Sequence, residues 1–321
     1  MATSAVTAGV DLGGTKIQTV VVVDEKVAGS ARVLTPQSGD PTDVIGAIVG
    51  TIRTALHAAG ASRDDLAGIG IGTPGEIDEQ TGAVLRAANV PGFADRVELA
   101  ALVSAAFRGT SVVVDNDVNV GVLGEHRRGA GRPFDNLLGV WVGTGVGGGL
   151  VLDGRLHDGR GAAGEIGHMV AKPGGRRCPC GRRGCVEAYA GRKSMEGRAR
   201  RLVEDGEKTS LFEIMKKRGR DRLSSGVYAR ALEQGDRMAH HLIDDAAWAL
   251  GLGLASAQNL LDLEAIIVGG GLGDRLGQPF VGQIVKQMTP RLFAPDKAPL
   301  VLGTELGDLA GAVGAAVLAS G

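Results

Sequence analysis

All three cysteines of the chain lie in one short, glycine-rich stretch, residues 165–187. Cys178, Cys180 and Cys185 have the spacing C-x-C-x4-C, and His168 precedes the first of them by ten residues. Three thiolates and one imidazole are a typical tetrahedral ligand set for a structural zinc ion. Cysteines placed independently would be scattered, so their clustering favours a zinc site over three inert thiols. The spacing is not that of a C-x2-C…H-x3-H finger, so zinc alone does not indicate nucleic-acid binding.

The bulk composition bounds the class of protein. A chain of 321 residues with 44% hydrophobic residues is long enough for two domains with sizeable cores. A net charge of −1 argues against nucleic acid as a partner. The N-terminus has no basic region followed by a long apolar run, and the longest uncharged run, residues 137–152, is too short and too glycine-rich to span a membrane. We therefore expect a cytoplasmic protein with no membrane partner.

Two segments have the pattern strand, glycine turn, strand. Residues 6–12 and 17–23 are β-branched apolar runs joined by Asp-Leu-Gly-Gly-Thr-Lys, and residues 137–142 and 150–152 flank Gly-Thr-Gly-Val-Gly-Gly-Gly. The pattern predicts antiparallel hairpins. The first turn lacks the P-loop spacing, and the second fits G-x-G-x-x-G but is followed by a strand, which argues against a dinucleotide fingerprint. Turn amides and the Thr15 hydroxyl can hold phosphate, so the repeat indicates a duplicated fold with phosphate between its halves.

A polar group, Asp115-Asn116-Asp117, separates a strand at 112–114 from a helix that runs to about residue 127. Turns of this kind present side chains in open α/β sheets, although Asn116 and Asp117 alone would suggest helix capping. Apolar periodicity predicts the remaining elements. The expected helices are 41–59, 97–107, two or three pieces within 192–234, 236–261, 276–292 and 306–318, and the expected further strands are 27–34, 69–73, 265–268 and 301–302.

Three glycine turns and one acidic group in this order resemble the sugar-kinase branch of the hexokinase/actin superfamily. Glu165-Ile-Gly-His168, followed by C-x-C-G-x2-G-C-x-E ending at Glu187, is similar to the signature of the ROK family, and within it to the ATP-dependent glucokinases. The resemblance implies an α/β fold of two ribonuclease-H-like domains with a cleft between them. The small domain would hold residues 1–116 plus 304–321, and the large domain residues 117–303.

The resemblance also implies the residues that bind ATP. The first phosphate motif matches Asp11, Gly13, Gly14, Thr15 and Lys16, the second matches Gly143, Thr144 and Gly145, and the adenosine motif matches Gly269, Gly270 and Gly271. Asp11 would hold one Mg²⁺ near the phosphates, through water.

Sugar contacts in the family correspond to seven polar or glycine positions of this chain: Gly75, Asn89, Asn116, Asp117, Glu165, His168 and Glu187. Asp117 would be the general base that accepts the proton of the glucose 6-hydroxyl, and its place at a helix N-terminus would favour the ionised form. Zinc bound by His168, Cys178, Cys180 and Cys185 would hold the sugar-binding residues in register. Phe93 stands where the family has tryptophan.

Three alternatives remain beside a glucokinase. A sugar-responsive repressor of the family needs a DNA-binding domain before the first phosphate motif, and only ten residues precede Asp11. A zinc-dependent interaction module would leave both hairpins and Asp117 without a role. A kinase for mannose, fructose, N-acetylmannosamine or another sugar stays open. For the phosphoryl donor, the adenosine-type glycines favour ATP over polyphosphate. The family implies a homodimer or homotetramer.

Overall fold

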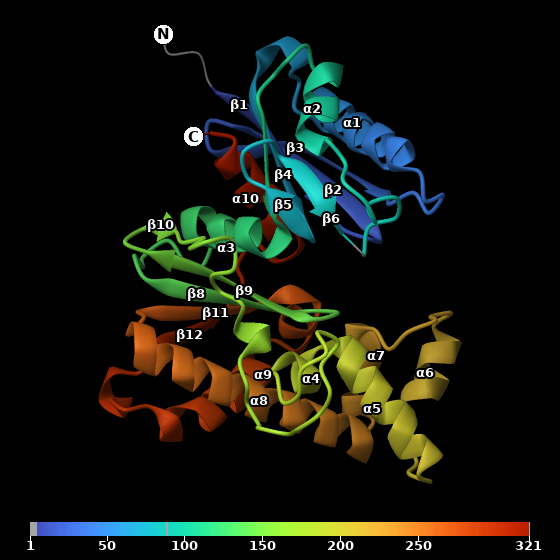
Figure 1. Ribbon diagram of the computed structural model, residues 1–321, viewed down its shortest axis with the longest axis vertical. Coiled ribbons are helices and arrows are strands. Elements are labelled where there is room, and N and C mark those ends of the chain that lie inside the picture. Colours follow the sequence, from blue (N-terminus) through green and yellow to red (C-terminus); the bar gives the residue numbers. More distant parts are fainter. Residues whose placement is uncertain (1–4, 88, 321) are drawn as a thin grey trace. The chain divides into compact units, whose positions relative to one another are not determined.

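The computed structural model describes residues 5–87 and 89–320, and the chain forms two compact units (Figure 1). The first unit is Met1–Pro133 with Asp308–Gly321, and the second is Phe134–Gly307. These units differ from the expected domains chiefly by helix α3 (Asp117–Arg128), which lies in the first unit. The reason is its packing against α10 (Ala310–Leu318), where Gly124 and Gly314 let the two helix backbones touch.

The first unit is built on a five-stranded sheet with the order β3-β2-β1-β4-β7. Strand β1 pairs antiparallel with β2 and parallel with β4, and β4 pairs parallel with β7. The strands span β1 (Val6–Leu12), β2 (Lys16–Val23), β3 (Lys26–Leu34), β4 (Leu66–Thr73) and β7 (Val112–Asn116).

The second unit repeats this plan in the order β10-β9-β8-β11-β12. Again an antiparallel hairpin is followed by two parallel strands. The strands span β8 (Leu137–Val142), β9 (Val146–Leu152), β10 (Arg155–Leu156), β11 (Ala265–Gly269) and β12 (Leu300–Gly303). The predicted α/β fold, its duplication and both hairpins are confirmed. A strand follows each of the two hairpin turns, as expected when neither is a P-loop or a dinucleotide fingerprint.

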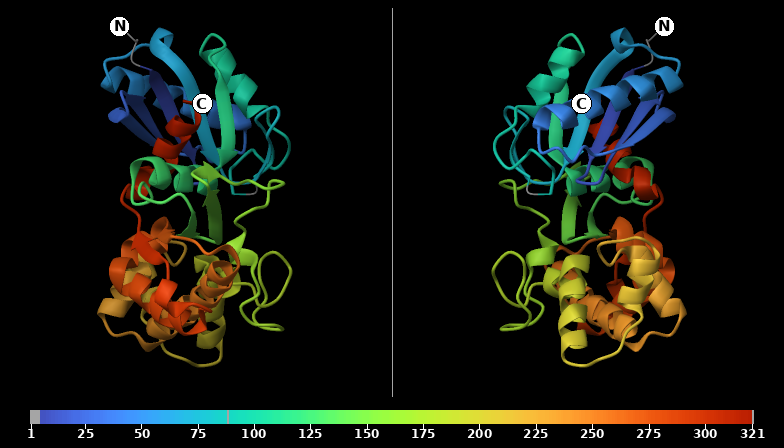
Figure 2. Two further views of the ribbon diagram at one scale, coloured as in Figure 1. Left: turned by 90° about the vertical axis from the view of Figure 1, so that its left-hand side faces the viewer. Right: turned by 90° about the vertical axis from the view of Figure 1, so that its right-hand side faces the viewer.

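Helices cover both faces of the first sheet (Figure 2). Helices α1 (Pro41–Ala58) and α2 (Leu99–Ala106) pack on the face that carries the core residues Ala8, Val10 and Leu12. Because side chains alternate along a strand, Gly9 lies on the opposite face, against α10. A short hairpin of β5 (Glu76–Asp78) and β6 (Ala83–Arg86), which the sequence analysis did not predict, precedes α2.

Glycines bring α10 into backbone contact with the first sheet. A Cβ atom at Gly9 would overlap the carbonyl oxygen of Ala312, and one at Gly70 would overlap that of Ala315. No larger residue fits at either strand position without moving the helix. The small residues of α10, read from the sequence as a terminal helix, are therefore half of a tight sheet–helix contact.

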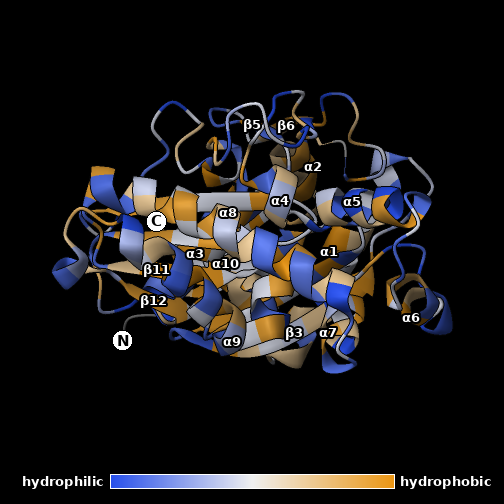
Figure 3. Cartoon of the chain, turned by 90° about the horizontal axis from the view of Figure 1, so that it is seen from below, coloured by the Kyte–Doolittle hydropathy of each residue, from blue (hydrophilic) through white to orange (hydrophobic). Residues whose placement is uncertain are grey.

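The second unit carries most of the helices, and hydrophobic and hydrophilic residues alternate along them (Figure 3). The predicted long helix is α8, which Asp236 caps by accepting from the backbone N–H of Ala239. The helices of the second unit are α4 (Glu187–Ala190), α5 (Arg192–Glu204), α6 (Leu211–Lys217), α7 (Ser225–Glu233), α8 (Arg237–Leu261) and α9 (Gly270–Met288). Single 3-10 turns are η1 (Arg63–Asp65), η2 (Ile166–His168), η3 (Thr289–Arg291), η4 (Pro295–Lys297) and η5 (Gly307–Leu309).

Helix α9 begins earlier than predicted. Gly270 and Gly271 form its first turn instead of a separate loop, and the helix breaks at Gly277, whose φ is 58°. The predicted start at residue 276 lies at this break. The first helical segment was not predicted, because its glycines are typical of a loop. Within the described residues, no helix has both the length and the apolar composition needed to cross a membrane.

The contact between α10 and the first sheet predicts a large stability difference between two glycine substitutions. Gly70→Ala should lower the free energy of unfolding by at least about 2 kcal/mol, because the new methyl group has no space. The matched control is Gly46→Ala in α1, where nothing lies within 4 Å of the new atom. That change should raise the free energy of unfolding by about 0.5–1 kcal/mol. Urea titration measures both, and equal stability of the two variants would contradict this packing.

Candidate functional site

The first glycine turn, residues 13–15, is fixed by hydrogen bonds to its carbonyl oxygens. The Thr35 hydroxyl donates to Gly13 O at 2.6 Å, the Thr35 N–H donates to Thr15 O at 3.0 Å, and Gln37 Nε2 donates to Gly14 O at 3.2 Å. Each carbonyl of the turn therefore has a donor from the segment after β3. A turn held in this way is preorganised to present its other groups to an anion.

Two residues predicted for the phosphate site, Asp11 and Lys16, lie beside this turn. Lys16 Nζ forms an ion pair with Asp308 at 3.3 Å. Asp11 lies near the end of strand β1, just before the glycines. Its pKa is raised to about 6, chiefly by burial; the nearby Lys16 lowers it and Asp308 raises it. The Asp11 carboxylate is thus more basic than an ordinary aspartate, and a bound cation would stabilise its ionised form.

Asn116 and Asp117 lie at the junction of β7 and α3. Asn116 is the N-cap of α3, and its side-chain oxygen accepts from the Val118 N–H at 2.9 Å. Asp117 Oδ1 lies 3.0 Å from the same N–H. Helix capping, the simpler interpretation of this pair, is therefore confirmed for Asn116. The role of the Asp117 carboxylate is a separate question.

Asp117 has a strongly perturbed pKa. Its pKa is about 7, compared with an ordinary value of 3.8: burial raises it most, the negative charge of Asp11 also raises it, and hydrogen bonding from the Val118 N–H lowers it. The hydrogen bonds at the helix N-terminus do favour the ionised form, as expected, but the net shift of the pKa is in the opposite direction. Removal of the carboxylate from water outweighs the helix N-terminus, because desolvation acts on the full charge.

The other two predicted sugar residues of the first unit lie on loops. Gly75 has φ = 112°, and a Cβ there would overlap the carbonyl oxygen of Arg86, so glycine is required. Asn89 is exposed, and its backbone oxygen lies so close to Gly14 that no side chain fits at that glycine. The structure thus places the loop of Asn89 directly on the first glycine turn.

The second glycine turn, residues 143–145, is held by the start of α5. The N–H of Arg192 donates to Gly143 O and that of Lys193 donates to Thr144 O, both at 3.1 Å. A Cβ at Gly145 would overlap the carboxylate of Glu187. The turn therefore sits between α5 and the end of the cysteine-rich stretch.

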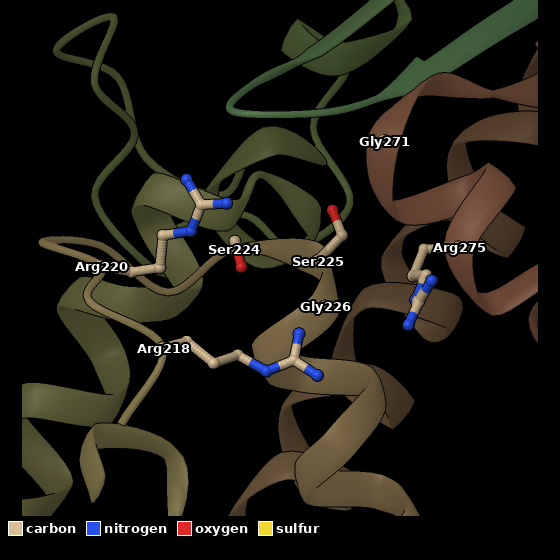
Figure 4. Close-up of a pocket in the computed structure, with 7 residues that line it drawn as sticks. All are labelled: Arg218, Arg220, Ser224, Ser225, Gly226, Gly271 and Arg275. Atoms are coloured by element: carbon tan, nitrogen blue, oxygen red, sulfur yellow. The ribbon is translucent and has the colours of Figure 1, made fainter. Parts of the chain in front are cut away.

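The third glycine group, residues 269–271, borders a cavity of about 440 Å³ that is lined by Gly271. Figure 4 shows the arginine side chains that surround it, from the α6–α7 connection and from α9. The lining contains no carboxylate; it consists of Arg218, Arg220, Ser224, Ser225, Gly226, Gly271 and Arg275. Sequence reasoning identified the glycines and missed these arginines, because they come from segments with no motif of their own.

The four predicted metal ligands converge. Their ligand atoms all lie within 4.8 Å of one another. Cys180 Sγ and Cys185 Sγ are 3.8 Å apart, and Cys178 Sγ lies 3.9 Å from His168 Nδ1. Two ligands held about 2.3 Å from a metal in a tetrahedron are roughly 3.8 Å apart, so the spacing fits a tetrahedral ion. The three cysteines are free thiols.

His168 can serve two ligands because its ring has two nitrogens. Nδ1 faces Cys178, whereas Nε2 lies 3.9 Å from the exposed carboxylate of Glu165. Both roles predicted for His168, metal ligand and sugar contact, are thus compatible with one ring orientation. A metal on Nδ1 would fix the ring and leave Nε2 for a hydroxyl group.

Glu187 connects the cysteine cluster to the second hairpin. Its Oε2 accepts from the Val146 N–H at 2.9 Å, and its Oε1 lies 3.8 Å from Cys178 Sγ. Gly167 allows η2 to lie on the same hairpin, since a Cβ there would overlap the Val146 carbonyl oxygen. The cluster, Glu187 and the glycine turn therefore form one connected structure within the second unit.

Comparisons with known proteins agree with these features. Residues 7–321 match the model of the ROK family. The chain is 34% identical to a glucokinase of Streptomyces coelicolor, over 98% of this chain and 97% of that protein, and 31% identical to an N-acetylmannosamine kinase of Yersinia pestis, over 83% of each. A crystal structure of a ROK family glucokinase from Streptomyces griseus in complex with glucose and AMPPNP superposes with a TM-score of 0.81, at 33% identity, covering 98% of this chain and 99% of that one.

The raised pKa of the partly buried Asp117 carboxylate predicts an unusual dependence of stability on pH. Its folded pKa, about 7, is above the ordinary value of 3.8, so the folded protein binds this proton more tightly than the unfolded chain does. The free energy of unfolding should therefore fall as pH rises from about 4 to 7. Asp117→Asn should remove this loss and stabilise the protein at pH 8, by on the order of 2–4 kcal/mol.

Chemical denaturation at pH 5 and pH 8 measures this difference. The control is Asp40→Asn at the exposed N-cap of α1, where hydrogen bonding from Thr42 lowers the aspartate pKa. That variant should show no gain at pH 8. A gain for Asp117→Asn that is equal at both pH values would contradict the perturbed titration.

Proposed function

Because this chain belongs to the ROK family and is similar to its sugar kinases, we propose that it is a glucokinase that transfers the γ-phosphoryl group of ATP to the 6-hydroxyl of glucose. The observation that supports this most is Asp117. A carboxylate whose pKa is about 7 can accept a proton at neutral pH far better than an ordinary aspartate.

In the proposed reaction, Asp117 accepts the proton of the glucose 6-hydroxyl as the hydroxyl oxygen attacks the γ-phosphorus of ATP. The bond from the γ-phosphorus to the bridging oxygen of ADP breaks, and ADP leaves with the electron pair of that bond. Asn116 is held beside Asp117 by the α3 cap and orients the sugar. Phosphoryl transfer depends on positioning and on charge neutralisation more than on covalent chemistry. Gly75, Asn89, Glu165, His168 and Glu187 would supply further contacts to the sugar.

The donor would lie along the three glycine groups. The amides of turns 13–15 and 143–145 would hold phosphates, and the cavity at Gly271 would take the adenosine. The residues present fit Mg²⁺, because Asp11 supplies a single, partly buried carboxylate, and this ion takes one or two carboxylates besides phosphate oxygens and water. When bound with ATP, Mg²⁺ would neutralise phosphate charge.

Zinc is the metal we propose for the cysteine cluster. Three sulfurs and one imidazole nitrogen at these separations suit zinc better than the oxygen-preferring Mg²⁺ or Ca²⁺. Its role would be structural: His168 and Glu187 both touch Cys178, so their positions depend on a closed cluster.

A kinase for another hexose or amino sugar is the second candidate, because the similarity to an N-acetylmannosamine kinase extends over 83% of the chain. A coupled ADP-release assay with glucose, mannose, fructose and N-acetylmannosamine decides between them. Glucose should give the highest kcat/KM. A clear preference for another sugar would change the proposed substrate but not the proposed kinase activity. No ADP release with any sugar would refute the proposal.

Asp117→Ala should reduce kcat by at least about 10²-fold while glucose still binds, because the variant loses the base and keeps the other contacts. In the unaltered protein, kcat/KM for glucose should fall about tenfold per pH unit below pH 7, following the protonation of Asp117. Steady-state assays and glucose titration measure both. A variant with unchanged kcat would remove Asp117 as the base.

One zinc ion per chain should copurify with the protein and be lost on replacement of a ligand. Cys180→Ser should lower zinc content, thermal stability and glucose affinity together, since metal binding and local folding are coupled. Arg177→Ser, an exposed neighbour outside the ligand set, is the control and should retain the metal. Elemental analysis that finds no zinc in active protein would disprove this assignment.

A further inference from the structure

We propose that Arg192 binds a phosphate group of the donor nucleotide, at a position between the turn of Thr144 and the turn of Gly271. The inference rests on the proposed function and adds a binding residue that none of the glycine motifs contains. It concerns residues of the second unit alone.

Arg192 lies between the two glycine groups of this unit that are proposed to bind ATP, residues 143–145 and 269–271. It is the first residue of α5, and its Nη2 donates to the Thr144 hydroxyl at 3.3 Å. A Cβ built on Gly271 would lie 4.0 Å from Arg192 Nη2 and 3.4 Å from the hydroxyl of Ser225, which lines the cavity. The guanidinium group thus lies between the proposed phosphate turn and the proposed adenosine cavity.

The charge of Arg192 has no counterion in the described part of the chain. No carboxylate pairs with it there, and its Nε is buried without a hydrogen-bond partner. Burial lowers the pKa of Arg192, although an arginine keeps its charge in proteins. A partly buried cation with an unused donor is therefore prepared for an anion that arrives from outside.

The position of Arg192 on its helix strengthens this conclusion. A positive charge at a helix N-terminus is unfavourable, and the first turn of α5 contains no acidic residue to offset it. The N–H groups of Arg192 and Lys193 already donate to the carbonyls of the glycine turn. Hence the guanidinium, with its planar set of donors, is the group left to meet a phosphate.

A purely structural role would be to tether Thr144, and the substitutions must separate the two roles. Arg192→Gln removes the charge and keeps an amide that can bond to the Thr144 hydroxyl. Arg192→Lys keeps a charge without the fork of donors. Lys193→Ala, a loss of charge at the adjacent exposed position, is the matched control.

Calorimetric titration with adenosine, AMP, ADP and ATP tests the proposal in each protein. Arg192→Gln should bind adenosine as the unaltered protein does and bind ADP and ATP about 10- to 100-fold more weakly, in line with the loss of one charge-assisted hydrogen bond. Arg192→Lys should recover part of the loss, and Lys193→Ala should match the unaltered protein. In assays, the KM for ATP should rise while the KM for glucose stays constant.

Other outcomes overturn the inference in distinguishable ways. Equal weakening of adenosine and ADP by Arg192→Gln would mean a structural role. Unchanged affinity for all four ligands would mean that Arg192 contacts no phosphate, with the proposed kinase activity intact. An unaltered protein that binds no adenine nucleotide would refute the proposed donor and this inference together.

Discussion

Direct contact between backbones, made possible by glycine, is the constraint on which the first unit depends. Gly9 and Gly70 let α10 rest on the sheet, and Gly314 lets α3 rest on α10. Since α3 begins at Asp117, this packing also fixes the direction from which the carboxylate leaves the end of β7. The position of Asp117 at the start of α3 thus depends on contacts between main chains that lie far from it in the sequence.

In the second unit the corresponding role belongs to Glu187. Its carboxylate holds the Val146 N–H on one side and faces Cys178 on the other. The turn between β8 and β9 is in turn bonded to the start of α5. A change of metal occupancy in the cysteine cluster would therefore be felt at the glycine turn, through a chain of contacts each shorter than 4 Å.

Much of this could be predicted from the sequence because the signals are local. Hairpins follow from strand–glycine–strand patterns, and a metal site follows from clustered cysteines. The features that could not be predicted depend on contacts between residues far apart in the sequence. Arg176 of the cysteine-rich stretch pairs with Asp245, and its guanidinium carbon lies 4.7 Å from the centre of the Tyr189 ring. Nothing in the sequence near residue 176 indicates the α8 carboxylate that it meets.

The direction of the Asp117 pKa shift also could not be predicted from the sequence, because it depends on the balance of two energies. A helix N-terminus can be recognised in the sequence, and its effect on a carboxylate is favourable by about 0.3–1 kcal/mol. Burial and the charge of Asp11 depend on tertiary structure, and they outweigh the helix N-terminus, so that the pKa is about 7 where an ordinary aspartate has 3.8. The protein thus keeps at neutral pH a carboxylate that costs it stability, and the same basicity is what would let that carboxylate take a proton from a sugar hydroxyl.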